Sequence, residues 1–207
     1  MSKRSYSSSV RADAAAEKRE RMIEAATQFF REEHGIQDFS LEAVGRAVGV
    51  TRVTVYNQFG SRNGLLEAVF DEVARKGGIV RLAEVEAVAD PRAALHRIVE
   101  IYCEFWSSDA AIGRLHDAMA TDPAIAQALA ERMARGWQVL VAVIARIAVN
   151  QAGVQAQRDT ADLIATFTSL AAFRMLAKAR PAGEVCSLLK AACDDAVERM
   201  MRGSTGR

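Results

Sequence analysis

The apolar positions of this sequence recur with helical spacing along most of its length. Residues 1–13 are polar and rich in serine, so we expect a disordered N-terminal arm there. A helix is predicted from about Ala14 to His34-Gly35, where glycine can supply a left-handed cap. The apolar stripe of this helix consists of Met22, Ile23, Ala26, Phe29 and Phe30.

Two short helices with a tight turn between them are predicted next, over residues 40–47 and 51–59. Ser40 and Thr51 are suitable N-caps, and Gly49 allows a sharp reversal of the chain. Valine and threonine in the second segment lower its helix propensity, so a strand is the local alternative. The helix is preferred because no neighbouring segment offers a strand with which to pair.

The remainder of the chain is also predicted to be helical. Ser61 caps a helix that stops at Gly77-Gly78 or continues with a kink toward Glu86. Two Asp-Pro pairs, at 90–91 and 122–123, mark further helix starts. One helix is expected from Pro91, and further helices over 109–120, 123–149, 158–179 and 183–202, with a loop over 150–157. The sequence therefore predicts an all-α protein.

Charge is informative locally rather than globally. The chain has 207 residues and a formal net charge of +1, so it is not a generally basic protein. Between Glu42 and Glu67, however, no acidic residue occurs, while Arg46, Arg52 and Arg62 do. A short cationic segment of this kind is typical of a phosphate-binding face. A solvated loop that merely lacks acids fits the charge equally well.

Other composition features narrow the class of protein. Cys103, Cys186 and Cys193 lie among apolar residues without a C-x-x-C pair, which indicates buried, reduced thiols, with redox sensing as the alternative. No apolar run approaches the roughly 20 residues needed to cross a bilayer, and the N-terminus lacks a secretory pattern. We therefore expect a cytoplasmic protein that does not bind membranes. The sequence indicates no cofactor, no metal site and no catalytic motif.

The two short helices have the size of a helix-turn-helix, in which the second helix enters the DNA major groove. Arginine suits guanine edges, asparagine and glutamine suit adenine edges, and hydroxyl groups reach phosphates. The N-termini of helices favour phosphate as well. The candidate DNA-binding residues are Ser40, Thr51, Arg52, Thr54, Tyr56, Asn57, Gln58, Ser61 and Arg62.

Residues 18–66 resemble the DNA-binding domain of the tetracycline-repressor (TetR) family. The matching positions are the cap Ser40, the turn Gly49-Val50-Thr51, the core Thr54-Val55-Tyr56-Asn57-Gln58-Phe59, the helix start Ser61-Arg62 and Leu65. The departures are Val53 for a small residue, Gly45 for Ala, Arg62 for Lys, and Asn63-Gly64 for an acidic residue and its neighbour. Gly45 is expected to weaken its helix by about 1 kcal/mol, and Val53 bears on how closely the second helix approaches DNA.

The resemblance implies specific roles. Tyr56 and Arg62 would contact phosphates, Thr54 a phosphate or a base edge, and Arg52 and Asn57 would select the sequence. The resemblance also implies a three-helix DNA-binding domain over 14–66, a helical effector-binding and dimerisation domain over 67–203, and a tail over 204–207. The basic residues of the arm would reach a flanking groove, or the arm is only a solubilising tail; they are Lys3, Arg4 and Arg11.

In the helical body the resemblance implies a homodimer on a palindromic double-stranded operator and a small hydrophobic or amphipathic effector. The expected effector-binding residues are Tyr102, Phe105, Trp106, His116, Met119, Trp137 and Phe173. The expected dimer interface consists of Phe167, Leu170, Ala171, Val185, Leu188, Leu189 and Ala192. For each of these residues the alternative is an ordinary place in the core of its own chain.

The leading interpretation is thus a transcriptional regulator, a repressor released from DNA by an effector, and not an enzyme. The first alternative is a helical enzyme or small-molecule carrier, which predicts no salt-dependent DNA binding. The second is an architectural or partner-binding protein, which predicts DNA binding without a response to an effector.

Overall fold

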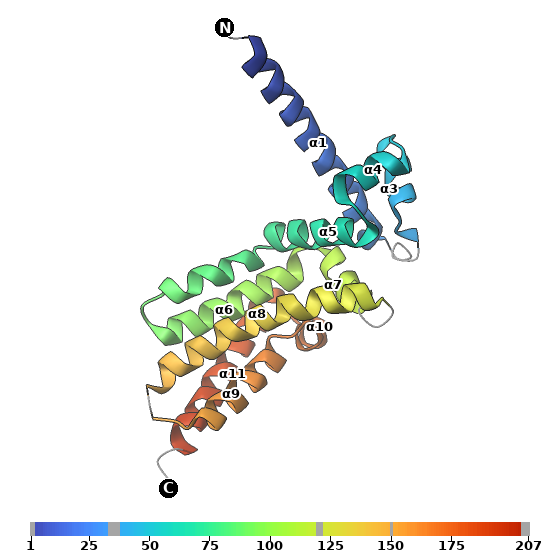
Figure 1. Cartoon of the computed structure of the whole chain (residues 1–207). Helices are drawn as coiled ribbons and strands as arrows, with labels where there is room; N and C mark the ends of the chain where they lie inside the picture. The colour runs from blue at the N-terminus through green and yellow to red at the C-terminus, as the bar shows by residue number, and fades with distance from the viewer. Residues whose placement is uncertain (1–2, 33–37, 119–121, 150, 204–207) are drawn as a thin grey trace. The chain divides into compact units, whose positions relative to one another are not determined.

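The structure, a computed structural model, describes residues 3–32, 38–118, 122–149 and 151–203, with side chains from residue 13 onward. Throughout these ranges the regular elements are helices, without a strand, which confirms the predicted all-α class (Figure 1). The chain forms two compact units. The first comprises Met1–Val73 and Ala110–Ala126, and the second comprises Ala74–Asp109 and Gln127–Arg207. The domain division at residue 66 that the sequence suggests stays a prediction.

The first unit is built from short helices around one long one. It contains α1 (Lys3–Arg31), α3 (Leu41–Val48), α4 (Arg52–Phe59), most of α5 (Arg62–Lys76), and α7 (Ala110–Asp117). Helix α1 packs against α3 and α7, and α3 packs against α4. The largest fully buried side chains of this unit are Met22, Phe30, Val44, Leu65, Leu66, Leu115 and Ile125. This apolar centre holds the two short helices in place.

Helix α1 begins earlier than the sequence suggests. It starts at Lys3 rather than near Ala14, so residues 3–13 are helical and not the disordered arm that we expected. The physical reason is that this segment contains neither glycine nor proline, and serine disfavours a helix only mildly. The predicted end at His34-Gly35 lies outside the described residues.

The second unit is a bundle of longer helices. After the 3₁₀ helix η1 (Ile79–Ala87) it contains α6 (Pro91–Ser108), most of α8 (Pro123–Ala148), α9 (Val154–Phe167), α10 (Leu170–Ala177) and α11 (Ala182–Gly203). Helix α11 packs against α6 and α9, and α6 packs against η1. Asp90 caps α6 by accepting hydrogen bonds from the backbone nitrogens of Arg92 and Ala93, each at 3.1 Å, as its Asp-Pro start predicts.

One predicted helix of this unit is divided in the structure. Residues 158–179 were expected to form a single helix, but α9 begins at Val154 and a break at Thr168-Ser169 separates α9 from α10. The hydroxyl of Thr168 donates to the carbonyl oxygen of Ile164 at 3.0 Å. Ser169 caps α10 by accepting a hydrogen bond from the Ala172 nitrogen at 3.2 Å. These side-chain bonds compete with the helical backbone pattern and end α9.

Candidate DNA-binding surface

The turn between α3 and α4 is made by glycine. Gly49 has φ 73° and ψ 35°, in the left-handed region, and its nitrogen donates to the Arg46 carbonyl oxygen at 3.3 Å. A Cβ placed on Gly45 would lie 2.9 Å from the carbonyl oxygen of Val50. Gly45 therefore lets α3 lie close to the backbone of the turn, a role that its cost in helix propensity alone does not reveal.

Three hydroxyl groups begin the helices of this surface, as the sequence predicts. Ser40 accepts a hydrogen bond from the Ala43 nitrogen at 3.1 Å, and Thr51 accepts one from the Thr54 nitrogen at 3.2 Å. Ser61 accepts one from the Gly64 nitrogen at 3.0 Å. Each oxygen satisfies a backbone donor that the start of a helix otherwise leaves without a partner.

Helix α4 presents one exposed side and one buried anchor. Val55 is fully buried, whereas Tyr56 is 52% exposed and Val53 is 64% exposed. Arg52, Asn57 and Gln58 are exposed as well, and Thr54 is half-buried against Thr51, with 3.0 Å between the two hydroxyl oxygens. The structure thus places the candidate reading residues together on the accessible side of one short helix. It also adds Val53, whose methyl groups suit the methyl group of thymine.

Arg62 makes three contacts within the first unit. Its Nε donates to the carbonyl oxygen of Phe39 at 3.3 Å, and its guanidinium lies 5.0 Å from the centre of the Phe39 ring. One of its terminal nitrogens lies 3.0 Å from Oδ2 of Asp122. The side chain is 35% exposed, so most of it is taken up by contacts within the first unit.

Two contacts of this unit were not found from the sequence. The guanidinium of Arg19, on α1, lies 5.0 Å from the centre of the Phe59 ring at the end of α4. The second is the pairing of Arg62 with Asp122. Both join residues that are far apart along the chain, and neither has a local pattern that could have revealed it.

The predicted effector-binding residues are only partly brought together. Tyr102 and Trp106 stack with their ring centres 6.1 Å apart, and Phe105 lies 4.9 Å from Trp106. Phe173 is buried in the core against which Tyr102 and Trp106 pack. Trp137 is 36% exposed and donates from Nε1 to Asp162 at 2.9 Å.

Two further members of the predicted effector-binding set are His116 and Met119. His116 belongs to the first compact unit. Met119 lies outside the described residues. The effector site therefore stays a prediction.

The predicted dimer residues divide by exposure. Leu170, Val185 and Leu189 are buried in the core of their own unit, at 3%, 0% and 4% exposed. Ala171 is exposed and Phe167 and Ala192 are half-buried. Leu188 is 43% exposed. Only this second group has surface left for contact with another chain.

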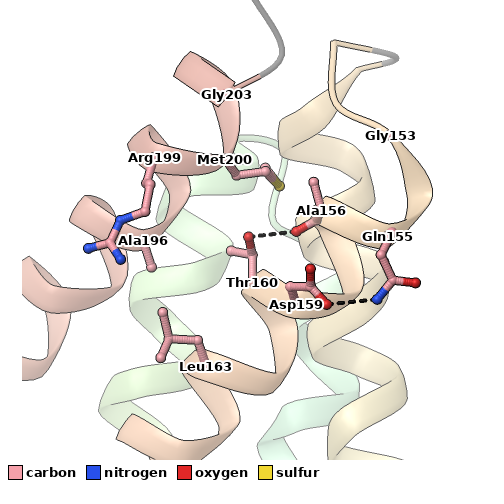
Figure 2. Close-up of a pocket in the computed structure, with 10 residues that line it drawn as sticks. All are labelled: Gly153, Gln155, Ala156, Asp159, Thr160, Leu163, Ala196, Arg199, Met200 and Gly203. Carbon is pink, nitrogen blue, oxygen red and sulfur yellow. Dashed lines mark hydrogen bonds between the residues drawn. The ribbon is translucent and has the colours of Figure 1, made fainter.

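The structure describes a pocket of about 690 Å³ between α9 and α11 (Figure 2). The residues that line this pocket include Thr160, Asp159 and Arg199. The hydroxyl of Thr160 donates to the carbonyl oxygen of Ala156 at 2.7 Å. A second pocket of about 540 Å³ has mainly charged walls of Arg81, Arg97, Glu100 and Lys190. Of the predicted effector-binding residues that the structure describes, none lines either pocket.

Two polar contacts join α6 and α11 at the second pocket. Nζ of Lys190 lies 2.6 Å from Oε1 of Glu100. This hydrogen bond lowers the pKa of Glu100, against the effect of burial, and raises the pKa of Lys190. Nε2 of His96 lies 2.9 Å from both carboxylate oxygens of Asp194. The pocket walls are therefore stabilised by the Lys190–Glu100 ion pair and the His96–Asp194 hydrogen bonds between α6 and α11.

Among the described residues, no group of three or more histidine, cysteine or acidic side chains could hold a metal ion. Within them, no helix combines the length and the apolar character needed to cross a bilayer.

Burial raises the pKa of Cys103 to about 12 and that of Cys193 to about 12, so both are protonated thiols at neutral pH.

Similar folds occur among solved structures. A Rhodococcus sp. protein described as a TetR-family transcriptional regulator superposes with a TM-score of 0.67 at 20% identity, over 88% of this chain and 99% of the other. A Saccharomonospora viridis protein described as a transcriptional regulator, solved in complex with choline, has a TM-score of 0.63 at 18% identity, over 88% and 96%. A TetR transcription regulator from Haloarcula marismortui ATCC 43049 has a TM-score of 0.60 at 16% identity, over 89% and 98%.

These likenesses establish the fold of the chain. No curated protein matches the sequence closely enough to count as a relative. The family model described as bacterial regulatory proteins, tetR family, matches residues 22–69, which include α3, α4 and the beginning of α5. Residues 22–69 thus match the DNA-binding domain of bacterial regulatory proteins of the tetR family.

Proposed function

We propose that the protein is a homodimeric transcriptional repressor that binds a palindromic operator and is released from it by a small-molecule effector. The observation that carries the proposal is helix α4. Its buried Val55 anchors it, and its accessible side presents Arg52, Tyr56 and Asn57. Because this helix lies within the matched DNA-binding domain, its exposed side chains are the natural candidates to enter the major groove.

The residues divide into two roles in this proposal. Arg52, Asn57 and Gln58 select the sequence through base edges. Tyr56, Thr54 and the cap residues Ser40, Thr51 and Ser61 contact phosphates and fix the register of the helix on DNA. Such phosphate contacts make the affinity fall steeply with salt concentration.

Dimerisation follows from the geometry of a palindrome. Two half-sites require two reading helices about 34 Å apart, one from each subunit. The exposed apolar residue Leu188, together with Ala171, Ala192 and Phe167, supports a subunit contact through α10 and α11 and the end of α9. We therefore propose these residues for the interface, and we assign Leu170, Val185 and Leu189 to the core of each subunit.

The effector is proposed to be a small hydrophobic or amphipathic molecule. The stacked rings of Tyr102 and Trp106, with Phe105 tilted against Trp106, suit an apolar or cationic group. The Saccharomonospora viridis protein, which has this fold, was solved with choline, a small cationic ligand. An effector can release DNA only if it binds the DNA-free state more tightly than the bound state. Such a regulator acts in the cytoplasm, where DNA and effector are both accessible.

The test is a selection of bound fragments from genomic DNA by the purified protein, repeated with Tyr56→Ala at two salt concentrations. Val80→Ala is the matched control, since Val80 is also a large exposed side chain, 55% exposed, but lies outside the matched domain. The expected result is a palindromic fragment bound by the wild type and the control, lost with Tyr56→Ala and weakened by salt. If the folded wild type enriches no fragment, the DNA-binding proposal fails and the helical enzyme or carrier becomes the better explanation.

A further inference from the structure

Asp122 uses its two carboxylate oxygens for two different purposes. Oδ1 accepts hydrogen bonds from the backbone nitrogens of Ala124 and Ile125, at 3.0 and 3.3 Å, and so caps the start of α8. Oδ2 lies 3.0 Å from the guanidinium of Arg62, at the start of α5. One acidic side chain therefore joins the beginnings of two helices within the first compact unit.

Arg62 extends this connection to the helix-turn-helix. Its Nε donates to the carbonyl oxygen of Phe39, which directly precedes Ser40, the cap of α3. Arg62 also follows α4 closely, because only Gly60 and Ser61 separate it from Phe59. Arg62 thus binds the chain just before the first helix of the motif, and Arg62 itself lies just after the second helix. Its ion pair with Asp122 connects both points to the start of α8.

The charges of this pair are maintained by their surroundings. Burial alone would raise the pKa of Asp122, but hydrogen bonds from the Ile125 nitrogen and from Arg62 outweigh it and lower the pKa. Asp122 is only 19% exposed as a side chain and Arg62 is 35% exposed, so solvent screens their attraction less than it would on an open surface. Asp122 is therefore a carboxylate at neutral pH.

We propose that Arg62 and Asp122 are positioning residues of the DNA-binding surface, which act through their ion pair rather than through contact with DNA. The inference rests on the proposed function, because it presupposes that α4 binds DNA. It differs from the role that the family resemblance implies for Arg62, which is a phosphate contact. It also adds Asp122, which no sequence pattern connects with DNA binding.

The two roles predict opposite effects of removing the acid. DNA repels a carboxylate, so the loss of an acidic charge near the binding surface ordinarily strengthens binding. A phosphate-binding Arg62 would also be freed by the loss of its competitor. If the Arg62–Asp122 ion pair instead positions the DNA-binding surface, loss of Asp122 weakens DNA binding although the protein becomes more positive.

Asp122→Asn is the variant of choice. Asparagine is as good an N-cap as aspartate, so α8 keeps its start. However, its single side-chain oxygen cannot both cap α8 and accept from Arg62, and its amide nitrogen would face the guanidinium. Asp122→Ser is the second variant, because serine also caps helices and is too short to replace Oδ2. Glu42→Gln is the control for charge, since Glu42 is 67% exposed on α3.

The experiment measures the affinity of the wild type and each variant for the selected fragment over a series of salt concentrations. We expect Asp122→Asn, Asp122→Ser and Arg62→Gln each to weaken binding about fivefold or more, and the Arg62→Gln/Asp122→Asn double variant to be no weaker than either single. The salt dependence should keep its slope in Arg62→Gln, since no phosphate contact is lost. Glu42→Gln should bind as tightly as the wild type or more tightly.

Two results would overturn the inference while the proposed function stands. One is binding by Asp122→Asn that equals or exceeds that of the wild type. The other is a fall of about one in the salt slope of Arg62→Gln, which would identify a phosphate contact. A wild type that binds no fragment contradicts the proposed function itself, and the inference with it. Thermal unfolding without DNA provides an independent check, because a genuine pair gives a non-additive double variant.

Discussion

Single side chains decide how this surface is presented. Val55 is fully buried while its neighbour Tyr56 is 52% exposed, so adjacent positions of α4 have opposite functions. Thr51 combines two features in one side chain. Its hydroxyl oxygen accepts a hydrogen bond from the Thr54 nitrogen, and the side chain remains exposed beside the candidate DNA-reading residues of α4. At this scale the effects of a substitution on folding and on binding can be separated by the choice of replacement.

Thr51→Ala should lower the free energy of unfolding by about 1 kcal/mol, because α4 loses its N-cap. Thr51→Ser keeps the capping oxygen and should stay close to the wild type. Thermal or urea unfolding in the absence of DNA measures both. Equal stability of Thr51→Ala and the wild type would contradict the assignment of Thr51 as a cap that matters.

The buried thiols predict a pH dependence of stability. Burial raises the pKa of Cys103 and of Cys193 from 9.0 to about 12. The unfolded chain therefore releases these protons at lower pH than the folded chain does. The stabilising effect is complete below about pH 9 and is lost as the pH rises toward 12.

Urea unfolding at a series of pH values from 8 upward measures this loss of unfolding free energy. A Cys103→Ala/Cys193→Ala variant is the control, because it keeps all other titrating groups and should lose stability less steeply.

Intact-mass analysis provides a second measurement of thiol burial. At pH 8 a thiol-alkylating reagent should modify at most one cysteine of the folded chain, the half-buried Cys186, and all three after unfolding. Rapid modification of three thiols in the folded protein would contradict the buried state.

At the scale of elements, helices are positioned by close approach as much as by apolar stripes. Gly136 lies in the interior of α8, and a Cβ placed there would be 2.4 Å from the hydroxyl oxygen of Tyr102 on α6. Tyr102 cannot easily move aside, because its ring stacks on Trp106 and packs against the core. The glycine therefore serves the packing of α6 against α8 within the second unit.

Gly136→Ala should consequently destabilise the protein, although alanine usually stabilises a helix interior by about 1 kcal/mol relative to glycine. Overpacking of this kind typically costs about 1–3 kcal/mol. In a Tyr102→Phe background the clashing oxygen is absent, and the same substitution should stabilise. Calorimetric melting of the four proteins measures the effect. A stabilising Gly136→Ala in both backgrounds would contradict the contact.

The elements also indicate what the sequence could reveal. The helix-turn-helix was predictable because its signals are local: Ser40 and Thr51 cap their own helices, and Gly49 reverses the chain within a few residues. The break at Thr168-Ser169 was not, since the same residue types also occur inside helices. The sequence predicts a role for Arg62 at this surface, but its pairing with Asp122 depends on folding that brings distant segments together. The capping and turn residues could be predicted from the sequence, whereas contacts between residues far apart along the chain could not.

At the scale of the whole molecule, the proposed function requires two copies of the chain. Leu188 and Leu189 form a natural matched pair for this question, because neighbouring leucines of α11 are 43% and 4% exposed. The first has surface to offer a partner, whereas the second fills the core of its own chain. Substitutions at the two positions should therefore fail in different ways.

Leu188→Glu should give a folded monomer with much weaker operator binding, because the two reading helices are no longer joined. Leu189→Ala should remain dimeric at low temperature but lose about 2–5 kcal/mol of stability. Sedimentation velocity and thermal unfolding separate the two outcomes. A Leu188→Glu protein that sediments as the wild-type dimer would place the interface elsewhere.

The first compact unit is assembled from two separate stretches, Met1–Val73 and Ala110–Ala126. The second stretch contributes Arg114, which donates to the backbone carbonyl of Arg31, and Asp122, the partner of Arg62. A gene segment that ends with α5 would therefore encode an incomplete unit. A recombinant that joins its donor at the end of α5 would keep the recipient's second stretch, so the halves of this unit would come from different proteins. An N-terminal segment exchanged with a relative should therefore fold well only if it extends through Ala126.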